Sequence, residues 1–287
     1  MIRQLAVVMG RGKPIEADFK YRREICKVGR WMYRQGFVVA SEGNLSVRLD
    51  ADRILVTPAG ACKGRLLPHE LIVTDLQGTV VAGTGRPTSE LQMHLLCYRL
   101  RPLVRAICHA HPPTATGFAA AGRALEEAVL PEVISALGKI PLAPYGTPGT
   151  KELCAGLEPL VPSYDAILLE NHGVVTCAEN LITAYQRMET VEHFARVMLV
   201  ADSIGGARLL THAQIQKLRV SNMERPQFNS AHSTLDSKSS ERRVMRIEDY
   251  GAPEGKYSKK SIVSAQAALL YMRASSFLKG LTPHGHS

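Results

Sequence analysis

The sequence predicts a single α/β domain followed by a tail of different composition. Short apolar, partly β-branched segments bounded by turn residues indicate strands, and longer stretches with apolar residues every three or four positions indicate helices. Hydrophobic residues make up 45% of the 287, which is enough to bury a core. Beyond about residue 212 apolar side chains become sparse, and such a composition does not fold on its own.

We therefore expect the chain to have four parts. They are an N-terminal extension over 1–17, the folded domain over 18–212, a low-complexity, disordered linker over 213–258, and an amphipathic helix with its tail over 259–287. Docking of this last helix on the protein's own oligomer is one interpretation, and attachment to a membrane surface or a partner is the other.

The first half of the domain begins with a helix and continues with strands. Residues 18–36 place Ile25, Val28 and Met32 at helical spacing, and Gly36 is a suitable C-cap. Four short strands separated by turn residues are expected over 45–49, 53–57, 71–75 and 79–82. A second helix is expected over 89–99.

The second half predicts buried strands and a long closing helix. Two apolar runs, 104–108 and 166–169, have the character of buried strands. Between them we expect a small helix near 114–121 and a loop rich in Pro and Gly over 141–149. A helix over 180–204, with apolar residues along one side, closes the domain.

The net charge of +9 comes from the two ends of the chain. Residues 1–23 contribute +4 and residues 215–287 contribute +6, whereas residues 24–214 sum to −1. A nucleic-acid-binding domain concentrates its basic residues on the folded body, so we expect no nucleic-acid partner. No apolar run approaches the roughly 18 residues of a membrane span. The apolar N-terminal stretch is too short for a signal peptide, and we expect a cytoplasmic protein.

A metal site is predicted at the end of an apolar strand, where the chain reads Cys108-His109-Ala110-His111-Pro112. Residues i and i+2 of a strand point to the same side, so the two imidazoles reach one point. Zinc needs at least a third ligand, and His172 also follows an apolar strand. The alternative is a pair of histidines that only make hydrogen bonds at a strand end.

Three small-residue segments are candidates for binding an anion. In Thr88-Ser89-Glu90 a loop enters a helix, with Thr88 or Ser89 as N-cap and free amides in the first turn. The segments 41–46 and 57–60 are loops that bring backbone amides close to a phosphate. Each segment is equally consistent with an ordinary cap or turn.

A lysine and a histidine lie near these segments in the sequence. Lys63 either adds charge to the same anion or is a solvated lysine. His94 lies one helical turn after Glu90, and we interpret it as a structural histidine.

The motifs G-N-x-S, T-P-x-G, P-T-S-E, H-x-H-P and N-H-G, in this order, resemble those of the class II aldolase/adducin family, whose best-known type is L-fuculose-1-phosphate aldolase. The resemblance covers about residues 18–210 and includes 143–150. It implies a three-layer α/β fold with a central, mainly antiparallel sheet flanked by helices. It also implies a homotetramer with active sites between subunits.

The resemblance assigns roles to individual residues. His109, His111 and His172 match the family's zinc ligands. Glu90 matches its catalytic acid/base, which also serves as a fourth metal ligand when no substrate is bound. The positions that hold the substrate phosphate match Gly43, Asn44, Gly60, Thr88 and Ser89, with Ser41 nearby. The implied reaction is the reversible, zinc-dependent cleavage of a ketose 1-phosphate into dihydroxyacetone phosphate and an aldehyde.

Two features depart from the family pattern. The aldolases place a tyrosine from a neighbouring subunit in the stretch that matches about 130–134, and this chain has none there. The tail after about residue 220 matches nothing in the family. The identity of the aldehyde therefore stays open.

The same fold serves other activities. They include 4-epimerases, methylthioribulose-1-phosphate dehydratases and decarboxylases of phosphorylated keto acids. The epimerases carry Asp in place of Glu90, which favours the aldolase. A non-catalytic, adducin-like structural protein is a further alternative, and it predicts loss of the zinc histidines, which are present here.

Overall fold

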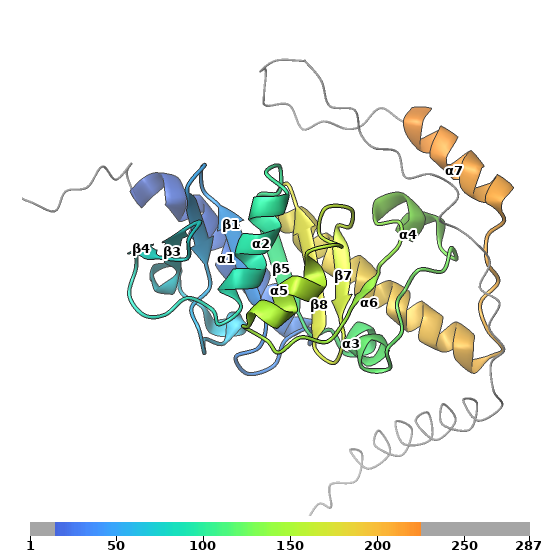
Figure 1. Cartoon of the computed structure of the whole chain (residues 1–287), viewed down its shortest axis with the longest axis horizontal. Helices are drawn as coiled ribbons and strands as arrows, with labels where there is room; N and C mark the ends of the chain where they lie inside the picture. Colours follow the sequence, from blue (N-terminus) through green and yellow to red (C-terminus); the bar gives the residue numbers. More distant parts are fainter. Residues whose placement is uncertain (1–14, 225–287) are drawn as a thin grey trace, which may run out of the picture.

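The computed structural model describes residues 15–224, and its centre is one eight-stranded sheet (Figure 1). The strands lie in the order β4-β3-β2-β1-β5-β8-β7-β6. Neighbouring strands are antiparallel except for β6 and β7, which are parallel. The bounds are β1 Asn44–Arg48, β2 Arg53–Val56, β3 Ile72–Asp75, β4 Val80–Ala82, β5 Ala106–Ala110, β6 Leu142–Ala143, β7 Ala166–Leu169 and β8 Gly173–Ala178.

Helices cover both faces of this sheet, so the described domain has three layers (Figure 1). Helices α1, α3 and α6 pack around one hydrophobic cluster, and α2 and α5 pack around a second cluster on the opposite face. The bounds are α1 Ile15–Arg34, α2 Leu91–Leu100, α3 Pro113–Ala120, α4 Pro131–Ala136, α5 Lys151–Leu157, α6 Leu181–Ser203 and α7 His212–Glu224, with short 3-10 helices η1 Lys63–Arg65 and η2 Pro68–Glu70. The predicted three-layer α/β fold with a mainly antiparallel sheet is confirmed.

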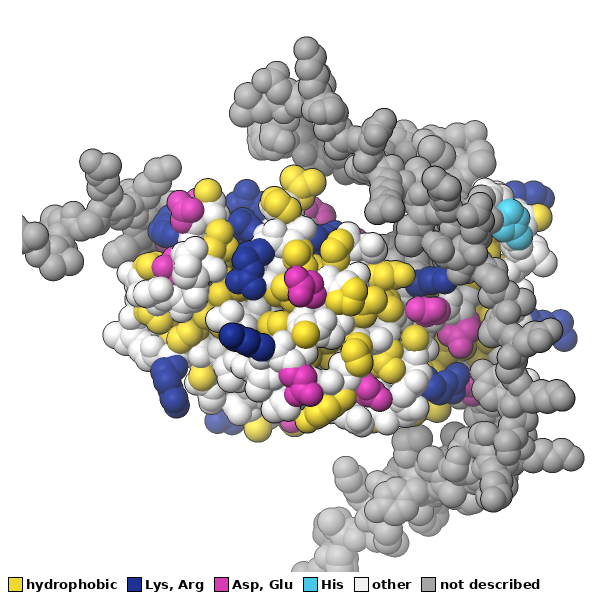
Figure 2. Space-filling view, viewed as in Figure 1, with side chains coloured by type: hydrophobic (Ala, Val, Ile, Leu, Met, Phe, Trp, Pro, Cys, Tyr) yellow, Lys and Arg dark blue, Asp and Glu magenta, His cyan; other side chains and the backbone are white. Residues whose placement is uncertain are grey.

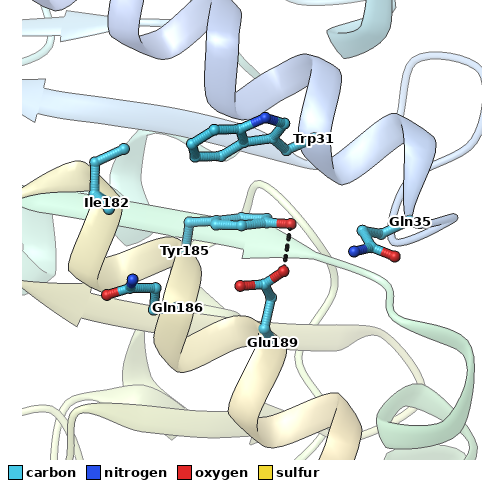
Figure 3. A pocket seen from close by; sticks show the side chains of 6 residues that line it. All are labelled: Trp31, Gln35, Ile182, Tyr185, Gln186 and Glu189. Atoms are coloured by element: carbon cyan, nitrogen blue, oxygen red, sulfur yellow. Dashed lines mark hydrogen bonds between the residues drawn. The ribbon is translucent and has the colours of Figure 1, made fainter.

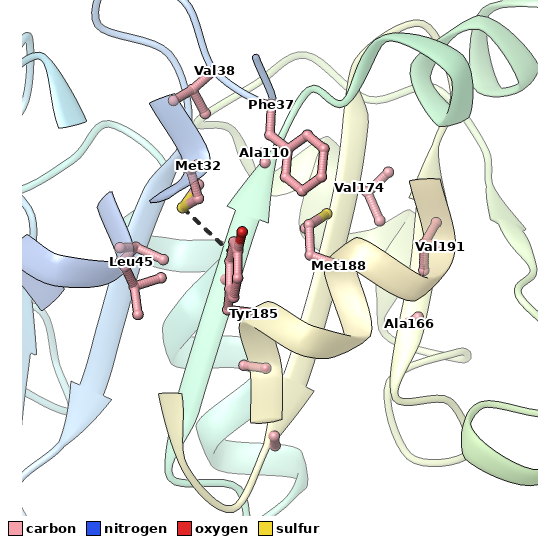
Figure 4. Packing of buried hydrophobic residues seen from close by; sticks show 14 of the residues in the cluster. Met32, Phe37, Val38, Leu45, Ala110, Ala166, Val174, Tyr185, Met188 and Val191 are labelled. Carbon is pink, nitrogen blue, oxygen red and sulfur yellow. Dashed lines mark hydrogen bonds between the residues drawn. The ribbon is translucent and has the colours of Figure 1, made fainter. Parts of the chain in front are cut away.

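Alternation along the strands decides which side chains face which layer. Leu45 of β1 belongs to the first hydrophobic cluster, together with Cys108 and Ala110 of β5 (Figure 4). Ser46 follows Leu45 and therefore points to the opposite face, which α2 covers. By the same alternation His109, between Cys108 and Ala110, points to the α2 face. The polar side chains of two neighbouring strands thus meet one helix.

Helix α2 begins two residues later than expected, and the predicted N-cap was wrong. Glu90 occupies the N-cap position and its side chain does not cap the helix. The backbone amide of Thr88 instead donates to the carbonyl of Thr57 at 3.0 Å, and Pro58 forms an isolated β-bridge with Pro87. The segment before α2 is therefore held against the 57–60 loop, and the helix can begin only after it.

Several elements were not anticipated. Strand β8 follows the predicted third histidine directly, β6 lies inside the expected 141–149 loop, and α4 and α5 fall in stretches without an assignment. Helix α7 covers residues that were expected to begin a disordered linker, and its Ile215 is buried. That part of the linker prediction was wrong, because contact with the folded body adds to a weak local pattern. The expectations for 1–14 and 225–287 lie outside the described residues.

The described surface carries charges of both signs. On the face shown in Figure 2, lysines and arginines are interspersed with aspartates and glutamates. Among the described helices, even the long ones lack an apolar stretch that could cross a bilayer.

Candidate metal centre

Sheet topology brings the three predicted histidines to one place, here called the histidine cluster: His109, His111 and His172. The first lies in β5 and the second directly after it. Ala110 of β5 pairs with Val174 of β8, so the end of β5 lies beside the start of β8, where His172 is located. The ring centroids are 4.8–5.0 Å apart, and one ligand atom from each ring lies within 4.8 Å of the others.

Glu90 bridges two members of this cluster. Its Oε2 lies 3.1 Å from Nε2 of His109, and its Oε1 lies 3.1 Å from Nε2 of His172. Glu90 is 7% exposed and His109 is fully buried, so the carboxylate and the imidazoles meet in a place largely withdrawn from water. Helix α2 places the carboxylate there because Glu90 stands at its first turn, facing β5.

The outer hydrogen bonds fix the orientation of two imidazoles. Nδ1 of His109 donates to the carbonyl of Val174 at 2.9 Å, because a carbonyl can only accept. Nδ1 of His111 faces Oε2 of Glu42 at 3.3 Å. Nε2 of both rings therefore faces inward. Such outer partners of metal-binding histidines set the tautomer and the ring orientation.

The inward-facing atoms fit a divalent cation. Nε2 of His109 and Nε2 of His111 lie 3.1 Å apart, so a proton or a metal ion has to lie between these two ring nitrogens. Oε1 of Glu90 is buried without a hydrogen-bond partner among the described residues, although it lies close to His172. Three imidazoles are a ligand set that zinc takes in catalytic sites, where the fourth position stays open to water or substrate.

Electrostatics within the centre favour an ionised Glu90 carboxylate and a neutral His111 ring. Burial alone would raise the pKa of Glu90, but the neighbouring imidazoles of His109 and His172 outweigh it and hold the pKa well below its usual range. Burial, followed by the charges of His109 and His172, lowers the pKa of His111 to about 3. A neutral imidazole is the form that binds a metal.

A buried chain of hydrogen bonds leads away from Glu90. Nδ2 of Asn44 donates to Oε2 of Glu90 at 2.8 Å, and Oδ1 of Asn44 lies 2.5 Å from Nε2 of His94. Nδ1 of His94 lies 2.6 Å from Oγ of Ser46, which in turn lies 2.8 Å from the hydroxyl of Tyr98. Burial lowers the pKa of His94 to about 3, so its ring is neutral and carries one N–H.

One arrangement of protons satisfies this whole chain. Because Oδ1 of Asn44 can only accept, Nε2 of His94 donates to it, and Nδ1 accepts from Ser46. The hydroxyl of Ser46 then accepts from Tyr98. Glu90, His94 and Tyr98 recur every four residues on α2, so one helix face supplies all three contacts. His94 is a satisfied buried histidine, and it also holds the amide that contacts Glu90.

The residues predicted to bind phosphate lie around this centre. Gly43 is buried with φ +66, and a Cβ there would lie 2.7 Å from the carbonyl oxygen of His109. Gly60 also has a positive φ, of +72, and nothing lies within 4 Å of a Cβ built on it. Ser89 is exposed. Thr88 is buried with its amide used by Thr57, so its backbone N–H is not available to a ligand.

The backbone at Gly173, where β8 begins, also lies very close to the histidine cluster. A Cβ on Gly173 would lie 2.5 Å from Cδ2 of His111 and 2.6 Å from the carbonyl oxygen of Ala110. No other residue fits at this position without moving a backbone or an imidazole.

Two supporting residues had no sequence signal that identified them. Glu42 contacts His111, as described above. Glu192 of α6 is 2% exposed and accepts from the amides of Thr114 at 3.0 Å and Ala115 at 2.9 Å. Its carboxylate therefore provides acceptors for backbone amides in the first turn of α3, which begins shortly after His111. From the sequence alone, an acidic residue within a long helix is interpreted as a surface charge. Only the contact of Glu192 with α3 in the folded protein shows its role.

A separate pocket lies between α1 and α6. It has a volume of about 320 Å³ and is lined by Trp31, Gln35, Ile182, Tyr185, Gln186 and Glu189 (Figure 3). Tyr185 donates to Glu189 at 2.8 Å, and its ring lies 5.3 Å from that of Trp31. The pocket shares no residue with the histidine cluster.

Comparison with known proteins agrees with the motifs of the sequence. The sequence model of the class II aldolase and adducin N-terminal domain matches residues 23–199. A 3-oxo-tetronate 4-phosphate decarboxylase of Pectobacterium atrosepticum is 33% identical over 195 residues, which cover 67% of this chain and 89% of that protein. An L-fuculose phosphate aldolase of Methanococcus maripaludis is 33% identical over 181 residues, covering 63% of this chain and 97% of that protein.

Solved structures agree with the sequence comparisons. An L-fuculose 1-phosphate aldolase superposes with a TM-score of 0.66 at 30% identity, covering 71% of this chain and 96% of that one. YgbL of Klebsiella pneumoniae, a putative aldolase/epimerase/decarboxylase, superposes with a TM-score of 0.65 at 31% identity, covering 70% of this chain and 98% of that one. Neither relative accounts for the tail beyond the domain.

Proposed function

Since the chain belongs to the class II aldolase and adducin family, whose relatives include lyases, we propose that it is a zinc-dependent aldolase. Its proposed reaction is the reversible cleavage of a ketose 1-phosphate into dihydroxyacetone phosphate and an aldehyde. The observation that carries this proposal is the convergence of His109, His111 and His172 on the Glu90 carboxylate.

Each group has a defined task in this proposal. When bound, a zinc ion supplies Lewis-acid polarisation of the substrate oxygens beside the bond that breaks. Glu90 moves the proton at the substrate carbon, and Asn44 holds its carboxylate in place. Amides of the loops at Gly43, Gly60 and Ser89 hold the phosphate and so fix the substrate relative to Glu90. These loop assignments come from the family resemblance.

The test is zinc content followed by turnover of zinc-loaded protein on a panel of ketose 1-phosphates. We expect about one zinc per chain and formation of dihydroxyacetone phosphate with at least one substrate. Absence of zinc binding would overturn the metal assignment. Absence of aldehyde product across the panel would overturn the aldolase assignment.

Decarboxylation of a phosphorylated keto acid is the second candidate. The decarboxylases of Pectobacterium atrosepticum and Escherichia coli (strain K12) are 33% and 32% identical to this chain. The chain also lacks a tyrosine in 130–134, the place where the aldolases carry one. Both reactions break a carbon–carbon bond and leave a negative charge next to a carbonyl group, so the same centre suits both. Release of carbon dioxide from a 3-oxo-tetronate 4-phosphate, without an aldehyde, would favour this candidate.

We further propose a homotetramer, as the family resemblance implies, and a cytoplasmic location, as the sequence composition and the short apolar N-terminal stretch led us to expect. Light scattering of the purified full chain measures the oligomer. Fractionation of the cells that make the protein measures its location.

A further inference from the structure

Lys63 is a buried lysine between two of the loops assigned to the substrate phosphate. It begins η1 and is 2% exposed, so its interpretation as a solvated lysine is wrong. Its Nζ donates to the carbonyl of Ser41 at 2.6 Å and to the carbonyl of Ala61 at 2.6 Å. One carbonyl precedes Gly43 and Asn44 in the chain, and the other follows Gly60. The ammonium group therefore links the two loops through one carbonyl of each.

This charge has no counter-ion among the described residues. Both hydrogen-bond partners of Lys63 are neutral carbonyls, and an ammonium group has a third N–H to donate. Glu42 and Glu90 act on it electrostatically, but each is already engaged by the histidine cluster. Buried charges in proteins are normally paired, because desolvation of an unpaired charge is costly. Burial accordingly lowers the pKa of Lys63 to about 8.

The backbone around Lys63 is held in place by close packing of α1. A Cβ on Gly29 of α1 would lie 2.6 Å from the carbonyl oxygen of Lys63. A Cβ on Gly64 would lie 2.5 Å from the ring of Tyr33, also in α1. Glycines on both sides thus let the helix approach η1 closely, and the lysine cannot move out to solvent without a change in this contact.

We propose that Lys63 is the counter-charge for the phosphate group of the substrate. The proposal rests on the function proposed above and adds to it the residue that neutralises the negative charge of the substrate's phosphate group. The loops at Gly43 and Gly60 supply backbone amides, and Lys63, bound to a carbonyl of each loop, supplies a positive charge. The Pro58–Pro87 bridge ties the third segment, with Ser89, to the same place. A phosphate monoester would complete the pairing that the protein leaves open.

The test compares zinc-loaded wild-type protein with two variants that remove this charge. Lys63→Met keeps the length and apolar stem of the side chain. Lys63→Gln keeps N–H donors for the two carbonyls and serves if the methionine variant does not fold. Lys20→Met, at an exposed position, is the control for the same change in net charge.

Inorganic phosphate is the binding probe, titrated by calorimetry. We expect about a 10- to 100-fold loss of phosphate affinity in both Lys63 variants, the loss of a charge-assisted contact, and none in the Lys20 control. Zinc content should be unchanged. For a ketose 1-phosphate that the wild type cleaves, KM of the Lys63 variants should rise by a similar factor while kcat changes little. For the same sugar without its phosphate group, kcat/KM of the variants should equal that of the wild type.

Three results would overturn the inference. They are wild-type phosphate affinity in both Lys63 variants, an equal loss for the sugar without phosphate, and a wild-type protein that binds no phosphate. Failure of the proposed function is a different result, namely no turnover on the whole panel. A Lys63-dependent phosphate affinity without such turnover would leave the inference standing and reject the reaction.

Discussion

The side-chain amide of Asn44 spans Glu90 and His94, donating to the first at 2.8 Å and lying 2.5 Å from the second. Asn44 is 3% exposed, and both ends of its amide are therefore used inside the protein. The resemblance assigned Asn44 to the phosphate. In this structure its side chain contacts the Glu90 carboxylate and the His94 ring.

Replacement of His94 by phenylalanine should lower kcat because Asn44 loses its orientation toward Glu90. Phenylalanine keeps an aromatic ring, although a larger one, but cannot donate to Asn44, so the amide can turn away from Glu90. Loss of such a supporting contact typically costs about 10- to 100-fold in activity. Steady-state kinetics and zinc analysis check the prediction. Unchanged kcat, or a fall in kcat that follows zinc loss alone, would contradict it.

Glu90→Gln should reduce kcat by about 10²- to 10⁴-fold, the range for loss of a general acid/base. The amide is nearly isosteric with the carboxylate but cannot take a proton. Substrate KM should change little, because the phosphate contacts remain. Near wild-type turnover would show that another group moves the proton.

Removal of His172 should weaken metal binding. His172→Ala takes away one of three converging rings, and zinc content after dialysis should fall well below one per chain. Added zinc at about a hundredfold excess over its Kd should stabilise the wild type by about 3 kcal/mol, and this gain should disappear in the variant. His193→Ala, an exposed histidine on α6, is the control and should retain both properties.

Glu192→Ala should destabilise the domain. The 2% exposed carboxylate accepts from two amides at the start of α3, and its loss leaves those donors buried without partners. A loss of about 2–4 kcal/mol in the free energy of unfolding is expected. Denaturant titration measures it. Glu179→Ala, at an exposed site, should stay within about 0.5 kcal/mol of wild type.

The stability of wild type relative to Lys63→Met should depend on pH. The pKa of Lys63 falls from 10.5 in the unfolded chain to about 8 in the folded protein, so the folded protein binds this proton more weakly than the unfolded chain does. At pH 7 the charged form costs the folded state roughly 3 kcal/mol. The variant should therefore be the more stable protein at pH 7. This advantage should shrink as the pH rises from about 8 to about 10.5, where the unfolded chain also loses its proton.

Unfolding titrations of both proteins at several pH values check this sign. A variant that is less stable at pH 7 would show that the two hydrogen bonds to Ser41 and Ala61 outweigh the cost of the buried charge.

Local rules were sufficient to predict most of the strands, the long helices and the pairing of two histidines. His109 and His111 could be predicted as a pair because alternation along a strand is a property of the strand itself. His172 and Glu90 required the order of motifs along the chain, since no local pattern states which strand ends lie side by side.

Tertiary contacts were the part that local rules missed. Asn44 and His94 are 50 residues apart, and nothing in either segment indicates that they share a hydrogen bond. The burial of Lys63 depends on Gly29 of α1, whose role appears only when the helix lies against η1. The late start of α2 has the same origin, because the amide of Thr88 is bound by Thr57.

The tight contact of Gly173 with His111 also limits how this protein can change. Every side chain at 173 would collide with an imidazole or a backbone oxygen, so a mutant library that includes this position would consist mostly of inactive clones. The open surroundings of Gly60 contrast with it, although its positive φ favours glycine, asparagine or aspartate there. Attempts to broaden the range of accepted substrates should therefore vary the loop around Gly60 and leave the start of β8 untouched.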